Sequence, residues 1–351
     1  MTSSAAAGQD TRSQWSRIRE RFFPVSASSG RHSSASSASS ADAVPPATPS
    51  SNRNDAWRAL ITEIEADERE ASERTSQLRS GLEAYHRSKL SAGCPVPTTP
   101  GFVRCCLRAK KYQVPKALQL ATNYAQFRVR TGWGPGAVTA AELRPELSLG
   151  LNLLLPNPDA QGNVVLTQSM SKMLDAGSSL ERLQRAGYYL LHRALQRREA
   201  QERGIALLLD FQGFSLSALR NIRMEDLRRG VSMLQDCFPA RLCVIYVLNE
   251  PRWLLLLVQL LRPLLSRDSM EQKFRLCGKG EGLRPHIPAA QLPSSLGLGG
   301  TLEFDWEAQL QRWEAEEARL GPSSWDPALL LNAEESRAAV ANSRWSRRLE
   351  S

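Results

Sequence analysis

Two continuous apolar segments, Ile205–Leu209 and Cys243–Leu248, constrain the fold of this chain most strongly. Each has the length of a strand, and neither alternates with polar residues as a half-exposed strand does. Helical patterns precede and separate them, at about Leu180–Arg203 and Met224–Phe238, and a further short β segment is expected at Val164–Thr167. Strands that are apolar on both faces and are separated by helices predict an α/β domain whose sheet is covered by helices.

A helical unit is expected before this domain. Asp55 can cap a helix that carries Trp57, Leu60, Ile61 and Ile64 on one stripe, and a proline-rich break follows at Cys94–Pro100. Pro115 suits the first turn of a later helix, which should end near Gly132. Residues 55–132 therefore read as a small all-helical unit.

The N-terminal tail has a different composition. Nine of the fifteen residues from Ser26 to Ser40 are serine, and prolines follow at 45, 46 and 49. Such a segment buries too little apolar surface to fold, so we interpret it as a disordered tail. An arginine-rich start leaves two alternatives open, a transit peptide for an organelle or a membrane-surface anchor. The predicted division is a tail at 1–54, a helical domain at 55–135, an α/β domain at 136–315 and a C-terminal tail at 316–351.

The most unusual segment is the nearly continuous apolar run from Trp253 to Leu261. A helix here is apolar on every side, whereas an ordinary surface helix shows one apolar stripe. The run is too short to span a bilayer. Arginines at 252, 262 and 267 bracket it. It is either a buried core helix or a lid over a lipid pocket that can dip into an anionic membrane.

Metal and catalytic sites find little support in the residue pattern. The six cysteines form no CxxC pair and the four histidines are scattered, so neither a zinc site nor a catalytic triad can be argued. No glycine-rich phosphate loop or acid/base pair is evident, and the arginines are not interleaved with aromatic residues as in a nucleic-acid-binding surface. We therefore expect no enzyme, no metal, no cofactor and no nucleic-acid partner. The cysteine usage is typical of a reducing, intracellular compartment.

Five motifs carry a family resemblance. Residues 102–112 (FVRCCLRAKKY) resemble the N-terminal helix of the CRAL-TRIO lipid-binding proteins, and residues 210–214 (DFQGF) resemble a strand end of that family. Three further matches follow in the same order. They are Asp236–Pro239 with Val247–Pro251, then Arg262–Leu265, and last Leu292–Pro293 with Gly299–Gly300. The chain resembles this family over about residues 100–315.

The resemblance implies a helical N-terminal domain followed by an α/β domain whose sheet floors an apolar cavity. It also implies a mobile gate helix over that cavity, here at about Trp253–Lys273. The residues expected to line the cavity and its gate are Leu207, Leu209, Phe211, Val244, Tyr246, Leu248, Trp253, Leu256, Leu257, Leu260 and Leu261. Tyr246 can point either way, because neighbouring side chains of a strand alternate.

Basic residues near the gate grip a phosphoinositide headgroup in the vitamin-E-carrier branch of the family. Residues that fall on or near those positions are Arg108, Arg241, Arg267 and Lys273, and Arg252, Arg262 and Arg267 are the expected membrane contacts. The sequence departs from the family pattern at four places. Cys243 stands at a position that is basic in that branch, and Ala240 replaces a glutamate that orients inositol in the yeast phosphatidylinositol carrier. The Leu296–Gly300 turn is longer than usual, and the stretch Ser169–Leu174 lacks the usual aromatic, basic start of the domain.

The formal net charge of +9 is concentrated near the gate. Sixteen basic and nine acidic residues lie between Arg182 and Arg275. Such a concentration around an apolar helix favours docking on an anionic membrane. We expect a monomeric, cytoplasmic, peripheral carrier that transfers a small hydrophobic lipid between membranes. The alternative is a lipid-sensing scaffold whose tails recruit partners.

Overall fold

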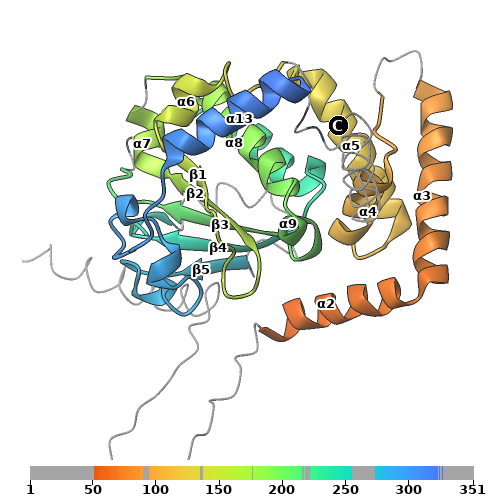
Figure 1. The fold of residues 1–351 in the computed structure, drawn as a ribbon, viewed down its shortest axis with the longest axis horizontal. Helices are drawn as coiled ribbons and strands as arrows, with labels where there is room; N and C mark the ends of the chain where they lie inside the picture. The colour runs from red at the N-terminus through yellow and green to blue at the C-terminus, as the bar shows by residue number, and fades with distance from the viewer. Residues whose placement is uncertain are drawn as a thin grey trace, which may run out of the picture.

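The computed structural model describes residues 51–89, 95–134, 137–175, 177–215, 217, 222–254, 273–322, 324 and 326. Figure 1 shows a group of helices from the N-terminal part lying beside a domain that is built around one sheet. The helical N-terminal region and the α/β domain predicted from the sequence are therefore both confirmed.

The helical unit comprises four helices, α2 (Ser51–Ala66), α3 (Glu68–Lys89), α4 (Pro100–Ala109) and α5 (Val114–Thr131). Their apolar sides enclose one core, in which Trp57, Leu82 and Phe102 are buried. The prediction that Asp55 caps the first helix is wrong, because α2 begins four residues earlier, at Ser51. The end of α5 at Gly132 is confirmed, and this glycine adopts the left-handed conformation, with φ of 68°, that suits a helix C-terminus.

The sheet contains five strands in the order β1-β2-β3-β4-β5. Their bounds are β1 (Asn152–Leu154), β2 (Val164–Ser169), β3 (Ile205–Asp210), β4 (Leu242–Leu248) and β5 (Phe274–Leu276). β1 is antiparallel to β2, and the other neighbours are parallel. The three strands expected from the sequence are therefore β2, β3 and β4. The two edge strands were not expected, because three residues carry too little pattern to be recognised.

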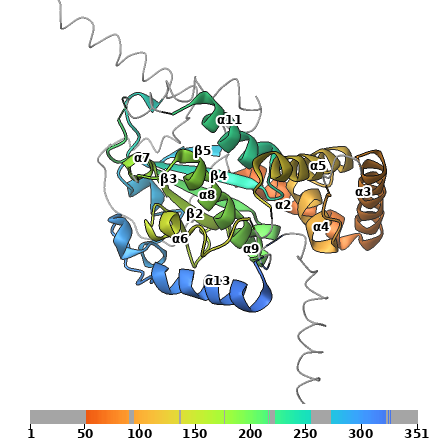
Figure 2. The same ribbon diagram turned by 90° about the horizontal axis from the view of Figure 1, so that it is seen from above.

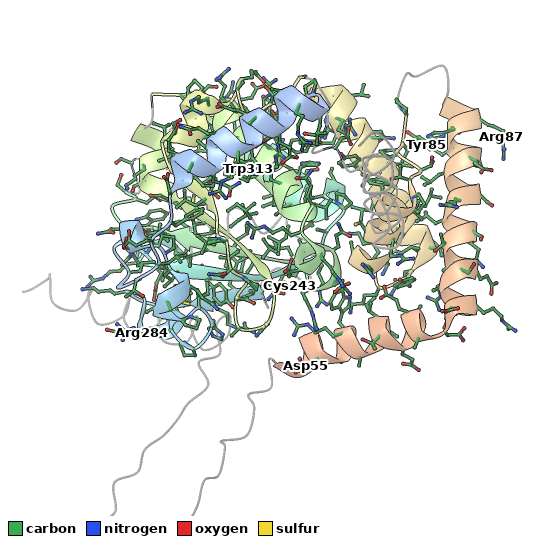
Figure 3. All side chains as sticks on the ribbon, in the orientation of Figure 1. Asp55, Tyr85, Arg87, Cys243, Arg284 and Trp313 are labelled. Atoms are coloured by element: carbon green, nitrogen blue, oxygen red, sulfur yellow. The ribbon has the colours of Figure 1, made fainter. Side chains whose placement is uncertain are left out.

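Helices of the α/β domain are α6 (Arg144–Ser148), α7 (Met170–Asp175), α8 (Leu180–Leu195), α9 (Arg198–Glu202), α11 (Met224–Ser232) and α13 (Trp306–Leu320). The helix predicted over 180–203 is divided, because α8 ends at Leu195 and α9 starts at Arg198. The helix predicted over 224–238 changes to a π-helical turn at Met233–Cys237. α13 belongs to the domain core, since Leu310 and Trp313 are buried there. Figure 3 shows Trp313 on the side of α13 that faces the body of the domain.

The two faces of the sheet are covered differently. We call the first the helix-side face, because its side chains share a core with α8 and the π-helical turn after α11 (Figure 2). The second, the back face, packs under the segment 277–302, which contains 3-10 turns at Glu281–Leu283, Ala289–Gln291 and Ser294–Leu296. This second core explains why the central strands are apolar on both sides.

Hydrogen bonds join the helical unit to the α/β domain. The Tyr124 hydroxyl lies 3.2 Å from Nε2 of His192 on α8, and Asn123 donates to the carbonyl oxygen of Asp236 at 3.3 Å. One turn further along the same side of α5, Arg128 forms an ion pair of 2.9 Å with the buried Asp326. These contacts hold the helices of the N-terminal unit against the edge of the sheet domain.

Candidate functional site

Two rows of apolar side chains cross the helix-side face. Strand register places Leu166, Leu207, Ile245 and Phe274 in one row. The next row toward the carboxyl ends of the parallel strands contains Leu209, Val247 and Leu276. All seven belong to one hydrophobic core or pack against it. The face is therefore an apolar floor that crosses the parallel strands.

The floor is incompletely covered at β5 and at the end of β3, on either side of the buried Val247. Leu209, Phe274 and Leu276 are only half-buried, whereas Leu207 and Ile245 in the centre of the sheet are buried. Because an apolar side chain gains stability from leaving water, a group of half-buried ones marks a surface on which an apolar ligand can pack.

An aromatic chain continues this floor away from the sheet. The ring centroids of Phe211 and Phe214 are 5.7 Å apart, and those of Phe214 and Trp253 are 5.3 Å apart. Trp253 is half-buried and packs against the same core, directly before the segment 255–272. The aromatic side chains thus lead from the end of β3 to the start of the predicted gate.

A polar turn directs the chain from β4 toward Trp253. Asn249 has a φ of 50°, in the left-handed region that asparagine tolerates better than most residues. Its amide side chain donates to Asp210 at 2.8 Å, and its backbone N–H donates to the carbonyl oxygen of Gly278 at 2.7 Å. Asp210 also accepts from the backbone N–H of Gln212 at 2.9 Å. The carboxylate of Asp210 therefore holds the turns that follow two neighbouring strands.

The strand residues predicted to line one cavity lie on both faces of the sheet. Leu207 and Leu209 are on the helix-side face, and Phe211 packs in the same core. Val244, Tyr246 and Leu248 are on the back face instead. This is a correction to the predicted lining. The register pairs Leu207 with Ile245 and Leu209 with Val247, and side chains of a strand alternate, so the even-numbered residues of β4 point away from Leu209.

Tyr246 has a structural environment on that back face. Its hydroxyl donates to Asp159 at 3.1 Å, and its ring lies 5.2 Å from that of His286. The residues that sequence reasoning missed on the helix-side face are Ile245, Val247, Phe274 and Leu276. The pairing of β4 with β3 identifies the first two. Of the gate residues, Leu256, Leu257, Leu260 and Leu261 lie outside the described residues, as do Arg262 and Arg267.

A cluster of basic residues lies where the helical unit meets the sheet. Burial is the main cause that lowers the pKa of Lys273 to about 8, and the positive charges of Arg241, Lys110 and Lys111 contribute to the same decrease. Burial also lowers the pKa of Arg241, with an additional contribution from Arg58 on α2. We call these five residues the interface basic cluster. Among the described side chains, no carboxylate is within ion-pair distance of Lys273.

Helix α2 completes this cluster. The guanidinium carbon of Arg241 lies 4.0 Å from the centre of the Trp57 ring, and Arg58 donates to the carbonyl oxygen of Gln161 at 2.5 Å. Figure 3 labels Cys243 at the start of β4, on the side of the domain near α2. Burial raises the pKa of Cys243, and its thiol donates to the carbonyl oxygen of Arg203 at 3.1 Å. Cys243 therefore brings no charge to the cluster.

Of the predicted headgroup residues, Arg241 and Lys273 are brought together, but Arg108 has another partner. Arg108 forms two hydrogen bonds with Glu65, of 2.5 and 3.0 Å, and the Tyr112 hydroxyl donates to the same carboxylate at 2.7 Å. Burial by itself would raise the pKa of Glu65, but Arg108 lowers it overall. Arg108 thus joins α4 to α2. Arg252 is exposed beside Trp253.

Sequence reasoning did not assign Arg58, Lys110 and Lys111 to a site. Arg58 is on α2, whereas Lys110 and Lys111 directly follow the end of α4, and only the packing of α2 and α4 against the sheet brings them near Lys273. Nothing in their sequence spacing indicates this arrangement.

Comparison with known proteins identifies the class. Residues 150–299 match the model of the CRAL/TRIO domain, which supports the CRAL-TRIO family for this part of the chain. The chain is 29% identical over 215 residues to a human protein named alpha-tocopherol transfer protein-like, an alignment that covers 60% of this chain and 62% of that protein. It is 27% identical over 213 residues to Clavesin-1 of Xenopus laevis, covering 58% of this chain and 62% of that protein. The chain thus spans less than two thirds of the length of the curated relatives it matches.

The solved structure of Sfh5 aligns with 71% of this chain and 98% of its own, at 13% identity and a TM-score of 0.47. Along the described ranges, none of the helices combines the length and apolar character needed to cross a membrane.

Proposed function

We propose that the chain binds one small hydrophobic lipid against the helix-side face of its sheet and transfers it between membranes without covalent chemistry. The observation that carries this proposal is the half-buried apolar group Leu209, Phe274 and Leu276 in a CRAL/TRIO domain. The name of one relative, a transfer protein for tocopherol or a protein like it, supports the same function. No cofactor would be needed, and the carrier would be a cytoplasmic monomer.

Burial is the physical basis of such transfer. A lipid in water exposes apolar surface at a cost of about 25 cal/mol per Å², and an apolar cavity removes that cost during transit. The gate would be the helix predicted at about Trp253–Lys273. Opening of the gate at a membrane would then limit the rate of transfer.

Filling the floor tests the proposal. Leu209→Trp and Leu276→Trp place a large ring where the lipid would lie, while Leu320→Trp is a control at an exposed position of α13. Transfer of lipid between vesicles should fall strongly for the first two variants and stay unchanged for the control. Native mass spectrometry of the purified protein should also detect a bound lipid. A protein that is empty and takes up no lipid would contradict the proposal.

The interface basic cluster supports docking on an anionic membrane, with a phosphorylated lipid headgroup as its partner. Several cations that repel one another in a partly buried place are stabilised by an anion of multiple charge. Binding to phosphoinositide vesicles should weaken with salt and with Lys273→Met. It should also weaken when Arg252, Arg262 and Arg267 are changed to Glu. Equal binding to neutral vesicles at any salt concentration would contradict this part of the proposal.

The lipid-sensing scaffold is the second candidate, and the tails predicted at 1–54 and 316–351 motivate it. Removing both tails separates the two functions. A carrier keeps its transfer activity without the tails. A scaffold loses its partners when the tails are removed, and it transfers no lipid with or without them.

A further inference from the structure

The back face carries a cavity, and the sheet itself separates this cavity from the proposed lipid site. Its volume is about 560 Å³, within the range of pockets that hold small molecules. The sheet contributes Leu208 and Leu248 to its wall, and the opposite wall comes from Leu296, Leu298 and Trp306. All of these residues belong to the back-face core or pack against it, so the cavity opens from that core.

The cavity lies where two departures from the family pattern meet. The long turn at Leu296–Gly300 supplies Leu296 and Leu298, and the atypical stretch at Ser169–Leu174 supplies Ser169, Ser171 and Lys172. Leu298 stands between Gly297 and Gly299, whose φ angles of 66° and 69° require the left-handed conformation. The two segments are far apart in the sequence, and both contribute to the wall of one cavity.

The walls are apolar and incompletely buried. Leu296, Leu298, Phe304 and Trp306 are all half-buried. Trp306 is nevertheless fixed, because its indole N–H donates to the carbonyl oxygen of Leu147 at 2.8 Å and its ring packs on Trp313 at 5.5 Å. The Trp306 ring is held in place and is only half-buried, so the apolar part of a ligand can pack against it.

The residues that line the cavity include hydrogen-bond donors and acceptors, with one positive and one negative side chain among them. Ser169, Ser171 and Lys172 can donate hydrogen bonds there, and Asp210 can accept them. The Oδ1 atom of Asp210 accepts from Asn249 and Gln212, and the second oxygen of a carboxylate can accept from a ligand. A charged head of either sign would meet one like charge at this rim. An uncharged hydroxyl head can donate to Asp210 and accept from Lys172.

We infer that this back-face cavity is a second ligand site, which takes a small amphipathic alcohol such as a monoacylglycerol, with its acyl chain against Trp306 and Leu298 and its hydroxyls at Lys172 and Asp210. The site is independent of the proposed lipid carrier function, because the sheet lies between the two. Part of its wall comes from the two segments in which the chain departs from the family pattern.

Quenching of tryptophan fluorescence tests the site with monododecanoylglycerol that carries bromine at the end of its chain. Saturable quenching is expected in the full-length protein. It should be largely lost in Trp306→Phe and retained in Trp253→Phe, which removes the tryptophan on the helix-side face. The reverse pattern would place the probe on the helix-side face and overturn the inference.

Two further comparisons test which class of ligand binds and whether it binds in this cavity. The bromine-tagged dodecanoate and dodecylamine should bind more weakly than the glycerol ester, and tighter binding of either would overturn the assignment of an uncharged head. Leu298→Trp should weaken binding about tenfold by filling the cavity, while the exposed Leu320→Trp should not. Leu209→Trp should leave binding of the probe unchanged even where it blocks lipid transfer, so failure of the two proposals can be told apart.

Discussion

The guanidinium group of Arg241 stacks on the ring of Trp57, with 4.0 Å between the guanidinium carbon and the ring centre. Arg241 precedes β4 and Trp57 is on α2, so this one contact joins the helical unit to the sheet. The same contact brings the positive charge of Arg241 close to that of Lys273. The helical unit thereby contributes to a basic surface as well as to the stability of the fold.

Lys273→Met should increase the thermal stability of the protein at pH 7 and weaken its binding to phosphoinositide vesicles. A buried ammonium among like charges costs stability, and an isosteric apolar side chain removes that cost. Lys279→Met, at an exposed position, is the matched control and should change neither property. Calorimetry and vesicle flotation measure the two effects. A variant that is less stable and binds normally would contradict this interpretation of the cluster.

Binding of inositol hexakisphosphate at pH 8 should be accompanied by proton uptake. The pKa of Lys273 is about 8 in the free protein, so about half of the molecules carry a neutral lysine there, and a bound anion raises that pKa. Titration calorimetry in buffers of different ionisation enthalpy measures the protons. The uptake should be absent in Lys273→Met and should vanish in the wild type near pH 6. Uptake that persists in the variant would assign it to another group.

Arg108→Met should destabilise the protein by about 2 kcal/mol, because it leaves the half-buried Glu65 without its cation. Arg198→Met removes an exposed ion pair with Glu202 and should leave the free energy of unfolding nearly unchanged. Denaturant unfolding gives both values. If Arg108 instead grips a headgroup, its replacement would weaken vesicle binding as much as Lys273→Met does, with little loss of stability.

The free energy of unfolding should decrease as the pH falls below about 6.5, and His192 should account for part of that decrease. Burial lowers the pKa of His192 to about 3, from a reference value of 6.5. Between these pH values the unfolded chain takes up a proton that the native protein does not, so acid favours unfolding. His192→Gln should flatten this part of the profile. An unchanged slope would show that His192 is protonated in the native state.

Gly204→Ala should cost about 3 kcal/mol or more. Gly204 has a φ of 109°, and a Cβ atom there would lie 2.6 Å from both the carbonyl oxygen of Arg241 and the sulfur of Cys243. Gly187→Ala on α8 is the control, because no atom lies within 4 Å of its Cβ position, and it should be neutral or stabilising. Chemical denaturation of the two variants compares them. Equal stabilities would contradict the close packing at the start of β4.

The sequence alone predicts the parts of this fold that have a long, regular pattern. The apolar runs at 205–209 and 243–248 are β3 and β4, and Pro115 and Gly132 mark the ends of α5 as expected. The lining of the floor was predicted less well, because the residues of β4 that face Leu209 depend on the register with β3. Ile245 and Val247, which occupy those places, have the same apolar character as Val244 and Tyr246.

The interface basic cluster could not be predicted from the sequence either, because it too depends on tertiary packing. Arg58, Lys110 and Lys273 are separated by long stretches of chain, and only tertiary packing brings their charges together. Family resemblance pointed to Arg108 as well, but the resemblance does not reveal that Glu65 on α2 has already neutralised it.

Photo-crosslinking tests the central claim, lipid binding on the helix-side face, most directly. The full-length protein is loaded with a lipid whose acyl chain carries a diazirine group, irradiated and digested, and the labelled residues are identified by mass spectrometry. The labels are predicted at the ends of β3 and β5 and at Trp253, with Leu209 and Leu276 among them. Absence of labelling on these residues, with label on the outer surface alone or with no lipid taken up, would contradict the claim.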